Sequence, residues 1–371
     1  MTDKSFYGFR EKSADAFFQS FALEIVAGCQ LQCENCYKDF KNGLCPMPES
    51  FVKRMIHEAG EVGFSEIVLI GGEPTLHPGL PEFIEWTLEA GLSPIVCTNG
   101  MALANKNYCE KIALPNTTIV IHGLVPLPST KMDEHVKFTG YADKLQEAYH
   151  NINTLRTSRD ITVVAEAVVI KPFLPYLLEF HKWCRENDYI PFIELNRRKD
   201  NGQESELSVS PEELCKTFKV LQNWDKQNAA HLTDQVLSPP AYGTKCTMSI
   251  TGIHVKNFGN NDYGGVYSCC AQTIRHGDLR KQSLGEIIYD PSMAVFKNQD
   301  QWIAGPCKTC KDYPACKGGC RGEATLAFGC PRSSCPACWR IPEKIRNDPN
   351  KMMPESCIGC PLEGKCTLRR E

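Results

Sequence analysis

The chain has 371 residues, of which 42% are hydrophobic and 23% are charged, a composition typical of a globular protein with a large core. Its 41 basic and 44 acidic residues give a net charge of -3, so no overall basic field indicates nucleic acid or an anionic membrane as a partner. The N-terminal stretch lacks an apolar signal core, and no run reaches the roughly 18 apolar residues of a membrane span, which predicts a cytoplasmic protein.

Short apolar strands alternate with amphipathic helices over the first 230 residues. Six strands are predicted, at 21–27, 66–70, 94–98, 117–121, 161–170 and 190–195. Helices are predicted between and after them, at 50–62, 80–90, 102–113, 140–157, 174–187 and 211–228. This alternation requires right-handed crossovers and a parallel sheet, with too few units for a closed barrel of eight. We therefore expect an α/β fold, a partial (β/α)6 TIM-like barrel.

Unusual residues follow the predicted strands, at the edge where parallel α/β folds place their active sites. In chain order they are Cys29, Gly71-Gly72-Glu73-Pro74, Thr98-Asn99-Gly100, His122, Lys171-Pro172 and Asn196-Arg197. Taken singly, GGEP and TNG are ordinary turns and a lone histidine is more often structural. Their expected position at one mouth favours a shared site.

The alternation stops near residue 232, which predicts a barrel domain over 1–231, a cysteine-rich domain over 232–345 and a cysteine-rich tail over 346–371. Twelve of the 21 cysteines lie between residues 269 and 366. A disulfide scaffold is disfavoured because the chain lacks an export signal and is long enough to build a core. Bound metal is the favoured use of the thiols, and it would supply folding energy to a region with little regular apolar pattern.

Three cysteines, Cys29, Cys33 and Cys36, lie within eight residues after the first strand. Three thiolates can bind three corners of a four-iron cluster and leave the fourth iron open to a ligand, whereas a four-cysteine cluster only transfers electrons. A structural zinc ion would need a fourth ligand close by, for which only Cys45 is available in this loop.

The CQLQCENC stretch followed by GGEP resembles the radical S-adenosylmethionine (SAM) enzymes, and the likeness extends over residues 21 to about 230. The resemblance implies that the amino and carboxylate groups of SAM chelate the open iron. It also implies that Glu73 and the Gly71-Gly72 backbone bind the methionine ammonium, with Pro74 completing this cofactor-binding motif, and that Thr98 and Asn99 lie near the ribose. His122 and the FTGYADKLQ segment at 138–146 look like the family's fourth strand and following helix. The chain departs from the family at Asn35, where an aromatic residue is usual.

The later cysteines resemble the SPASM domain, which binds two auxiliary 4Fe-4S clusters in many radical SAM enzymes. The resemblance assigns Cys246, Cys269 and Cys320 to the first cluster, with Cys270 competing with Cys269. It assigns the second cluster to four further thiols, Cys307, Cys310, Cys316 and Cys338.

The tail repeats the spacing of that second set, because CIGCPLEGKC at 357–366 matches CKTCKDYPAC at 307–316. Cys357, Cys360 and Cys366, with Cys330 or Cys335 as the fourth ligand, are predicted to hold either a third auxiliary cluster or a zinc ion. Five cysteines without such spacing are expected to be ordinary thiols: Cys45, Cys97, Cys109, Cys184 and Cys215.

The resemblance implies reductive cleavage of SAM to a 5'-deoxyadenosyl radical that abstracts hydrogen from a substrate, with a reductant such as flavodoxin or ferredoxin. A peptide or protein substrate is favoured, because the length is similar to that of anaerobic sulfatase-maturating enzymes. Two alternatives remain: oxidation or epimerisation of a small molecule, and a non-catalytic iron-sulfur electron carrier. No catalytic residue is assigned. Glu194, Asp262 and Lys171 are candidate bases by position, and Arg197-Arg198-Lys199 is expected to be a solvated charge run.

Overall fold

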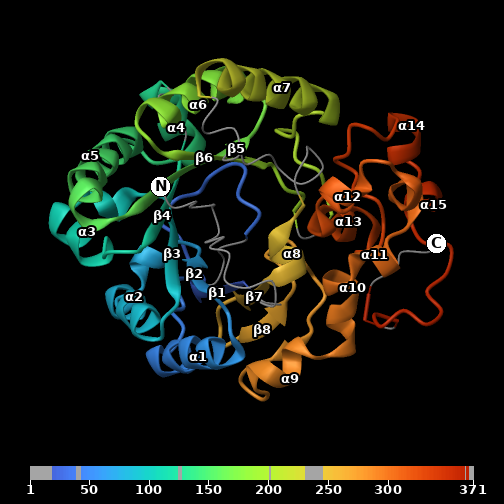
Figure 1. Cartoon of the computed structure of the whole chain (residues 1–371). Coiled ribbons are helices and arrows are strands. Elements are labelled where there is room, and N and C mark those ends of the chain that lie inside the picture. Colours follow the sequence, from blue (N-terminus) through green and yellow to red (C-terminus); the bar gives the residue numbers. More distant parts are fainter. Residues whose placement is uncertain are drawn as a thin grey trace.

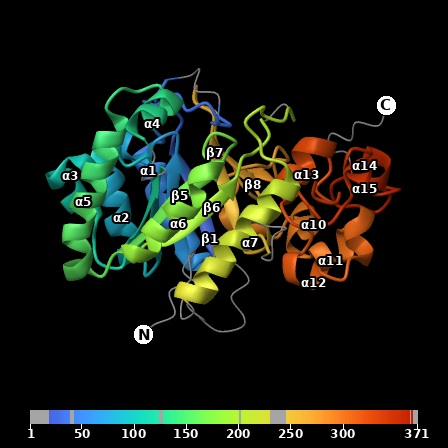
Figure 2. The ribbon, with the colours of Figure 1, turned by 90° about the horizontal axis from the view of Figure 1, so that it is seen from above.

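The computed structural model describes residues 19–38, 43–123, 128–199, 202–229, 245–363 and 365–366. Its first part is a ring of parallel strands with helices on the outside, and the C-terminal part packs at one side of this ring (Figure 1; Figure 2). Within the described ranges no helix is long and apolar enough to cross a membrane.

All six predicted strands of the barrel are present and pair in parallel in the order of the chain. They are β1 (Ser20–Val26), β2 (Glu66–Gly71), β3 (Ser93–Thr98), β4 (Thr118–His122), β5 (Thr162–Val169) and β6 (Ile190–Leu195). The helices are α1 (Glu49–Val62), α2 (Leu80–Glu89), α3 (Lys106–Ile112), α4 (Ser129–Val136), α5 (Tyr141–Arg159), α6 (Leu177–Glu186) and α7 (Pro211–Asn228). The predicted partial barrel is therefore confirmed.

Two helical details differ from the prediction. The expected helix at 102–113 is a short 3-10 helix (Met101–Ala104) followed by α3, because Asn105 caps α3 by accepting a hydrogen bond from the Tyr108 backbone N–H at 3.1 Å. Helix α4 was not expected from the sequence, and its eight residues carry a short apolar face at Met132 and Val136.

The strands bury side chains on both faces. One face packs against the helices and forms the main core. On the other face a smaller cluster contains one side chain from each of β1 to β5: Ala22, Val68, Ile95, Val120 and Val164. Because these five are neighbours across the sheet, they form an apolar layer inside the barrel.

The sheet extends beyond the six predicted strands. Strand β7 (Ile253–Asn257) pairs in parallel with the free edge of β1, and β8 (Tyr263–Tyr267) and β9 (Gly277–Asp278) continue the sheet in antiparallel fashion. The region predicted as the second domain thus begins by covering an edge that would otherwise expose unpaired backbone groups. Figure 1 shows β7 and β8 between the barrel and the C-terminal helices.

The remaining C-terminal helices are short. They are α8 (Thr247–Thr251), α9 (Leu284–Ile288), α10 (Ala294–Lys297), α11 (Gln299–Trp302), α12 (Tyr313–Cys316), α13 (Arg321–Phe328), α14 (Glu343–Arg346) and α15 (Pro349–Met352). An ion pair joins α14 to α7, because Arg346 Nη1 lies 2.7 Å from Glu212 Oε1. Short helices, short strands and the loops between them make up this part of the chain.

A buried carboxyl group at the start of β2 makes the stability depend on pH. Glu66 is fully buried, and its hydrogen-bond partner is the Ser20 hydroxyl. Burial raises the pKa of Glu66 from 4.5 to about 7. The folded chain holds the Glu66 proton more tightly than the unfolded chain does, so protonation of Glu66 stabilises the fold. This stabilisation is complete below about pH 4.5 and is lost as the pH rises through about 7.

We therefore expect Glu66→Gln, which can still accept the Ser20 hydrogen bond, to unfold at a higher temperature than the parent at pH 8. The gain should be at most about 3 kcal/mol, and it should nearly vanish at pH 5, where Glu66 is already neutral. The stability gain is measured by thermal unfolding of both anaerobically purified proteins at pH 8 and at pH 5. Exposed Glu89→Gln is the control, and an equal gain at both pH values would contradict the prediction.

Candidate active site

The loop after β1 carries the three clustered cysteines, Cys29, Cys33 and Cys36, all half-buried. Two N–H groups approach the Cys29 sulfur, the Leu31 backbone amide at 3.4 Å and the Asn99 side-chain amide at 3.7 Å. A turn joins the other two cysteines, because the Cys36 N–H donates to the Cys33 carbonyl at 3.1 Å. Amide donors to a cysteine sulfur stabilise the thiolate that a cluster requires.

The thiols of this loop influence one another. Burial, together with the neighbouring Cys36 thiol, raises the pKa of Cys29 to about 11 and that of Cys33 to about 12. A bound cluster would reverse this preference, because its irons stabilise thiolates. Among the described residues no three His, Cys, Asp or Glu side chains converge as a single-ion site would require. The three thiols fit a cluster in which each sulfur binds a different iron.

Gly71 and Gly72 allow the end of β2 to touch the cysteine loop. The Gly72 N–H donates to the Val26 carbonyl and the Glu73 N–H to the Gly28 carbonyl, both at 2.9 Å. A side chain at Gly72 would overlap the Gly28 carbonyl, and one at Gly71 would overlap the carbonyl of Val26. The two glycines therefore allow the turn after β2 to lie directly against the cysteine loop. The lack of side chains would also allow a ligand to come close to their backbone.

Glu73 is 1% exposed, and its carboxylate accepts four hydrogen bonds from the chain. The Thr75 N–H and hydroxyl donate at 3.1 and 2.6 Å, the Thr98 hydroxyl at 2.6 Å and the Asn99 N–H at 2.7 Å. Burial raises its pKa, and these donors oppose the shift. The carboxylate thus holds the 3-10 helix Pro74–Leu76 and the end of β3 against each other. Its predicted contact with the methionine ammonium stays a prediction.

Tyr141 was not singled out from the sequence, although it lies within the FTGYADKLQ segment. Its hydroxyl is 2.9 Å from the carbonyl oxygens of Asn99 and of His122, so the first residue of α5 bridges the ends of β3 and β4. Gly100 follows with a φ of 80°, in the left-handed region that favours glycine. The TNG turn and His122 are therefore held together, as their predicted position at one edge requires.

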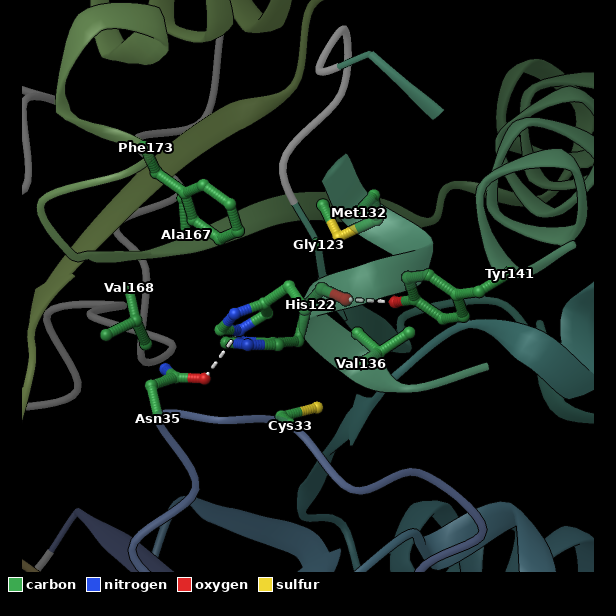
Figure 3. A pocket seen from close by; sticks show the side chains of 11 residues that line it. Cys33, Asn35, His122, Gly123, Met132, Val136, Tyr141, Ala167, Val168 and Phe173 are labelled. Carbon is green, nitrogen blue, oxygen red and sulfur yellow. Dashed lines mark hydrogen bonds between the residues drawn. The ribbon is translucent and has the colours of Figure 1, made fainter. Parts of the chain in front are cut away.

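A pocket lies beside the cysteine loop, lined by Cys33, Asn35, His122, His135 and Phe173 among others (Figure 3). Asn35, at the position where the family has an aromatic residue, lies 2.8 Å from the His135 ring through its side-chain oxygen. The ring of His135 packs edge-on against Phe173, with 4.7 Å between centroids. Burial lowers the pKa of His135 to about 4, so its imidazole is neutral near pH 7. The hydrogen-bonded side chains of Asn35 and His135 give the pocket a planar polar wall that the sequence did not indicate.

Charged side chains at the ends of β4, β5 and β6 form a second cluster at the mouth. His122 Nδ1 is 3.7 Å from the Glu166 carboxylate, and Arg197 makes two 3.0 Å bonds to Glu194. Arg197 also contacts the sulfur of Cys270. Burial raises the pKa of Glu194, which the Arg197 charge opposes. The barrel and the cysteine-rich region thus meet at this edge.

The expectation of a solvated charge run at 197–199 was wrong for its first two residues. The Arg198 guanidinium lies 2.7 Å from Glu204, and its backbone N–H donates to Glu323 of α13 at 3.0 Å. Glu194 and Glu204 flank the run in the sequence and Glu323 is distant from it, and the sequence pattern did not show that these carboxylates pair with the two arginines. Of the candidate bases, Asp262 and Lys171 are exposed, whereas Glu194 is half-buried and pairs with Arg197 at the mouth.

The predicted ligands of the first auxiliary cluster lie close together. Burial raises the pKa of Cys269, and the thiols of Cys270, Cys320 and Cys246 raise it further. Burial also raises the pKa of Cys320, to about 12, with Cys246 adding to it. The Cys270 thiol belongs to the same group and also contacts Arg197 at the barrel mouth, so the assignment of Cys269 rather than Cys270 stays a prediction.

The second predicted set lies around α12. Cys307, Cys316 and Cys338 are buried and Cys310 is half-buried. The Cys310 N–H approaches the Cys307 carbonyl at 3.3 Å, and the Cys307 N–H donates to the Ser334 hydroxyl at 2.9 Å. Burial raises the pKa of Cys338, and the Cys307 thiol raises it further, so these two thiols are neighbours.

Two family models match the chain. A 4Fe-4S single cluster domain matches residues 21–147, and SPASM, an iron-sulfur cluster-binding domain, matches residues 258–311.

Known proteins match over most of the chain. The AdoMet-dependent heme synthase of Methanosarcina barkeri is 22% identical over 335 residues, which cover 83% of this chain and 92% of the relative. The PqqA peptide cyclase of Xanthomonas euvesicatoria is 22% identical over 340 residues, which cover 87% of this chain and 88% of the relative. A solved structure of native anSMEcpe with bound AdoMet and the Kp18Cys peptide has a TM-score of 0.63 at 18% identity, covering 82% of this chain and 90% of that chain.

The partial barrel, its cysteine loop and these matches define an iron-sulfur enzyme. The chain belongs to the radical SAM enzymes that carry a C-terminal SPASM domain. Its cofactors are 4Fe-4S clusters and SAM. The family and the cofactors predicted from the sequence are thereby confirmed, whereas the ligand residues stay predictions.

The contact between the glycine pair and the cysteine loop predicts that Gly72→Ala is harmful, because the new methyl group has no room beside Gly28. We expect a loss of about 2–3 kcal/mol in stability and reduced iron incorporation. Gly285→Ala in α9 is the control, since no atom lies within 4 Å of its added Cβ. Thermal unfolding and iron analysis test the pair. Equal behaviour of the two variants would contradict the role given to Gly72.

Proposed function

We propose that this enzyme reductively cleaves SAM and abstracts a hydrogen atom from a peptide or protein substrate, leading to its oxidation or cross-linking. The observation that carries the proposal is the three-thiol loop held against the buried Glu73 network at one edge of the barrel. The PqqA peptide cyclase match and the anSMEcpe structure with a bound peptide support the substrate class.

In this proposal Cys29, Cys33 and Cys36 bind three irons of a cluster and leave one iron for SAM. When bound, the cluster and SAM supply the electron and the 5'-deoxyadenosyl radical for hydrogen abstraction. Asn99 contributes two hydrogen-bond donors. Its side-chain amide donates to the Cys29 sulfur, and its backbone N–H donates to the Glu73 carboxylate. Glu73 thereby links the position of the cluster loop to that of the predicted ribose site.

The pocket wall has a separate task, which is to exclude water and competing hydrogen donors from the reacting carbon. Met132, Val136 and Phe173 present apolar side chains there, beside the neutral His135. The charged cluster of His122, Glu166, Glu194 and Arg197 offers polar groups that orient a substrate at the mouth. Auxiliary clusters in the SPASM domain would accept the electron that remains after oxidation.

A small-molecule substrate is the second candidate, because the heme synthase of M. barkeri matches this chain as well as the peptide cyclase does. Both candidates share the cleavage of SAM. They differ in the carbon that loses hydrogen, which an isotope experiment can identify.

The common step is tested first. Anaerobically reconstituted protein with SAM and dithionite, or reduced flavodoxin or ferredoxin, is expected to form 5'-deoxyadenosine. Cys33→Ala should lower its formation to background because the cluster loses one of three ligands, whereas Cys215→Ser should retain it. Chromatographic detection of the nucleoside provides the measurement. Intact SAM in all samples would reject radical chemistry and favour an electron carrier.

The substrate class is tested by deuterium transfer. Candidate peptides and, separately, an iron porphyrin are supplied in deuterated form, and mass spectrometry of 5'-deoxyadenosine reports which one donates its label. We expect label from a peptide. Label from the porphyrin alone would overturn the peptide proposal in favour of the small-molecule candidate.

A further inference from the structure

The tail after residue 346 contains three cysteines, Cys357, Cys360 and Cys366, that neither family model covers. Their spacing repeats that of residues 307–316, and the sequence left open whether Cys330 or Cys335 accompanies them. The structure places the Cys330 loop, which follows α13, next to the tail.

Arg332 connects the two segments. Its Nη1 donates to the Ser356 carbonyl at 3.0 Å, directly before Cys357, and its Nε donates to the Trp302 carbonyl at 3.1 Å. On the Cys330 side, a turn brings the Ser333 N–H to the Cys330 carbonyl at 3.2 Å. Cys330 is therefore tied to the start of the tail motif through a residue two positions away.

The tail motif has a local scaffold of its own. The Cys360 N–H donates to the Cys357 carbonyl at 2.9 Å, the same turn that the Cys307–Cys310 pair makes. Cys360 and Leu362 are buried against Val295 and Phe296, and Cys366 packs on the same apolar cluster. An ion pair of 3.3 Å between Lys365 and Asp290 fixes the last turn.

Cys335, the other candidate, is tied to the second auxiliary set. Its carbonyl accepts a hydrogen bond from the Cys338 N–H at 3.2 Å, and the hydroxyl of the neighbouring Ser334 accepts one from the Cys307 N–H at 2.9 Å. These contacts favour Cys330 as the partner of the tail thiols.

We propose that Cys330, Cys357, Cys360 and Cys366 bind a third auxiliary 4Fe-4S cluster, with one thiolate on each of its four irons. Arg332 joins the Cys330 turn to the start of the tail motif, and Cys360 and Cys366 of that motif lie on one apolar cluster. Four thiolates without an open position are the arrangement of a cluster that transfers electrons and does not bind substrate. The Arg332 guanidinium is bonded to the backbone directly before Cys357, where its positive charge offsets part of the negative charge of such a cluster.

The test uses the full chain, purified and reconstituted without oxygen. Cys360→Ser and Cys366→Ser are each expected to lose about four iron and four sulfide per chain, with unchanged zinc. Cys215→Ser, a buried cysteine in α7, controls for loss of a thiol and should lose neither. Reduced samples should also lose one cluster signal in electron paramagnetic resonance.

Formation of 5'-deoxyadenosine is measured in the same samples and should persist, which shows that the barrel is folded and its own cluster is loaded. Because the metal count needs no substrate and no SAM cleavage, it stands even if the proposed function fails. Unchanged iron and sulfide in both variants would overturn the proposal. Loss of one zinc ion with unchanged iron would overturn it as well, since the tail would then be a zinc site.

Discussion

The buried Glu73 carboxylate is the interaction on which the candidate site depends. It accepts hydrogen bonds from the turn after β2 and from the end of β3, and Asn99 in turn donates to the Cys29 sulfur. A charged group in the interior is costly unless its oxygens are bonded, so the two loops must stay in place to satisfy it. The glycine pair before Glu73 then brings this network against the cysteine loop.

A second buried carboxylate links the barrel to the C-terminal region. Glu24 of β1 lies 2.7 Å from Lys38, just after the cysteine loop, and 2.9 Å from His254 of β7. It also accepts the Asn257 N–H at 2.9 Å. Because β7 shares the sheet with β1, the SPASM region is anchored directly beside the loop where SAM is expected to bind.

Residues with local patterns were the ones that could be assigned from the sequence. The six strands, the edge that carries the polar residues and the cofactor class all follow from periodicity and short motifs. Tyr141, His135 and the contact of Arg198 with Glu323 were missed, because these contacts join segments distant in the chain. Asn35 was noticed only as a departure from the family, and its histidine partner lies 100 residues away.

The sequence by itself determined the parallel barrel through its local periodicity, and the iron-sulfur clusters and SAM through the family resemblance that its short cysteine and GGEP motifs carry. The tertiary structure alone decided that β7 covers the edge of β1, that Glu73 joins two turns, and that Arg332, two residues after Cys330, bonds to the backbone beside Cys357. The reason is physical. Strand pairing and buried charge depend on the packing of the whole chain, and many segments of similar local pattern compete for each position.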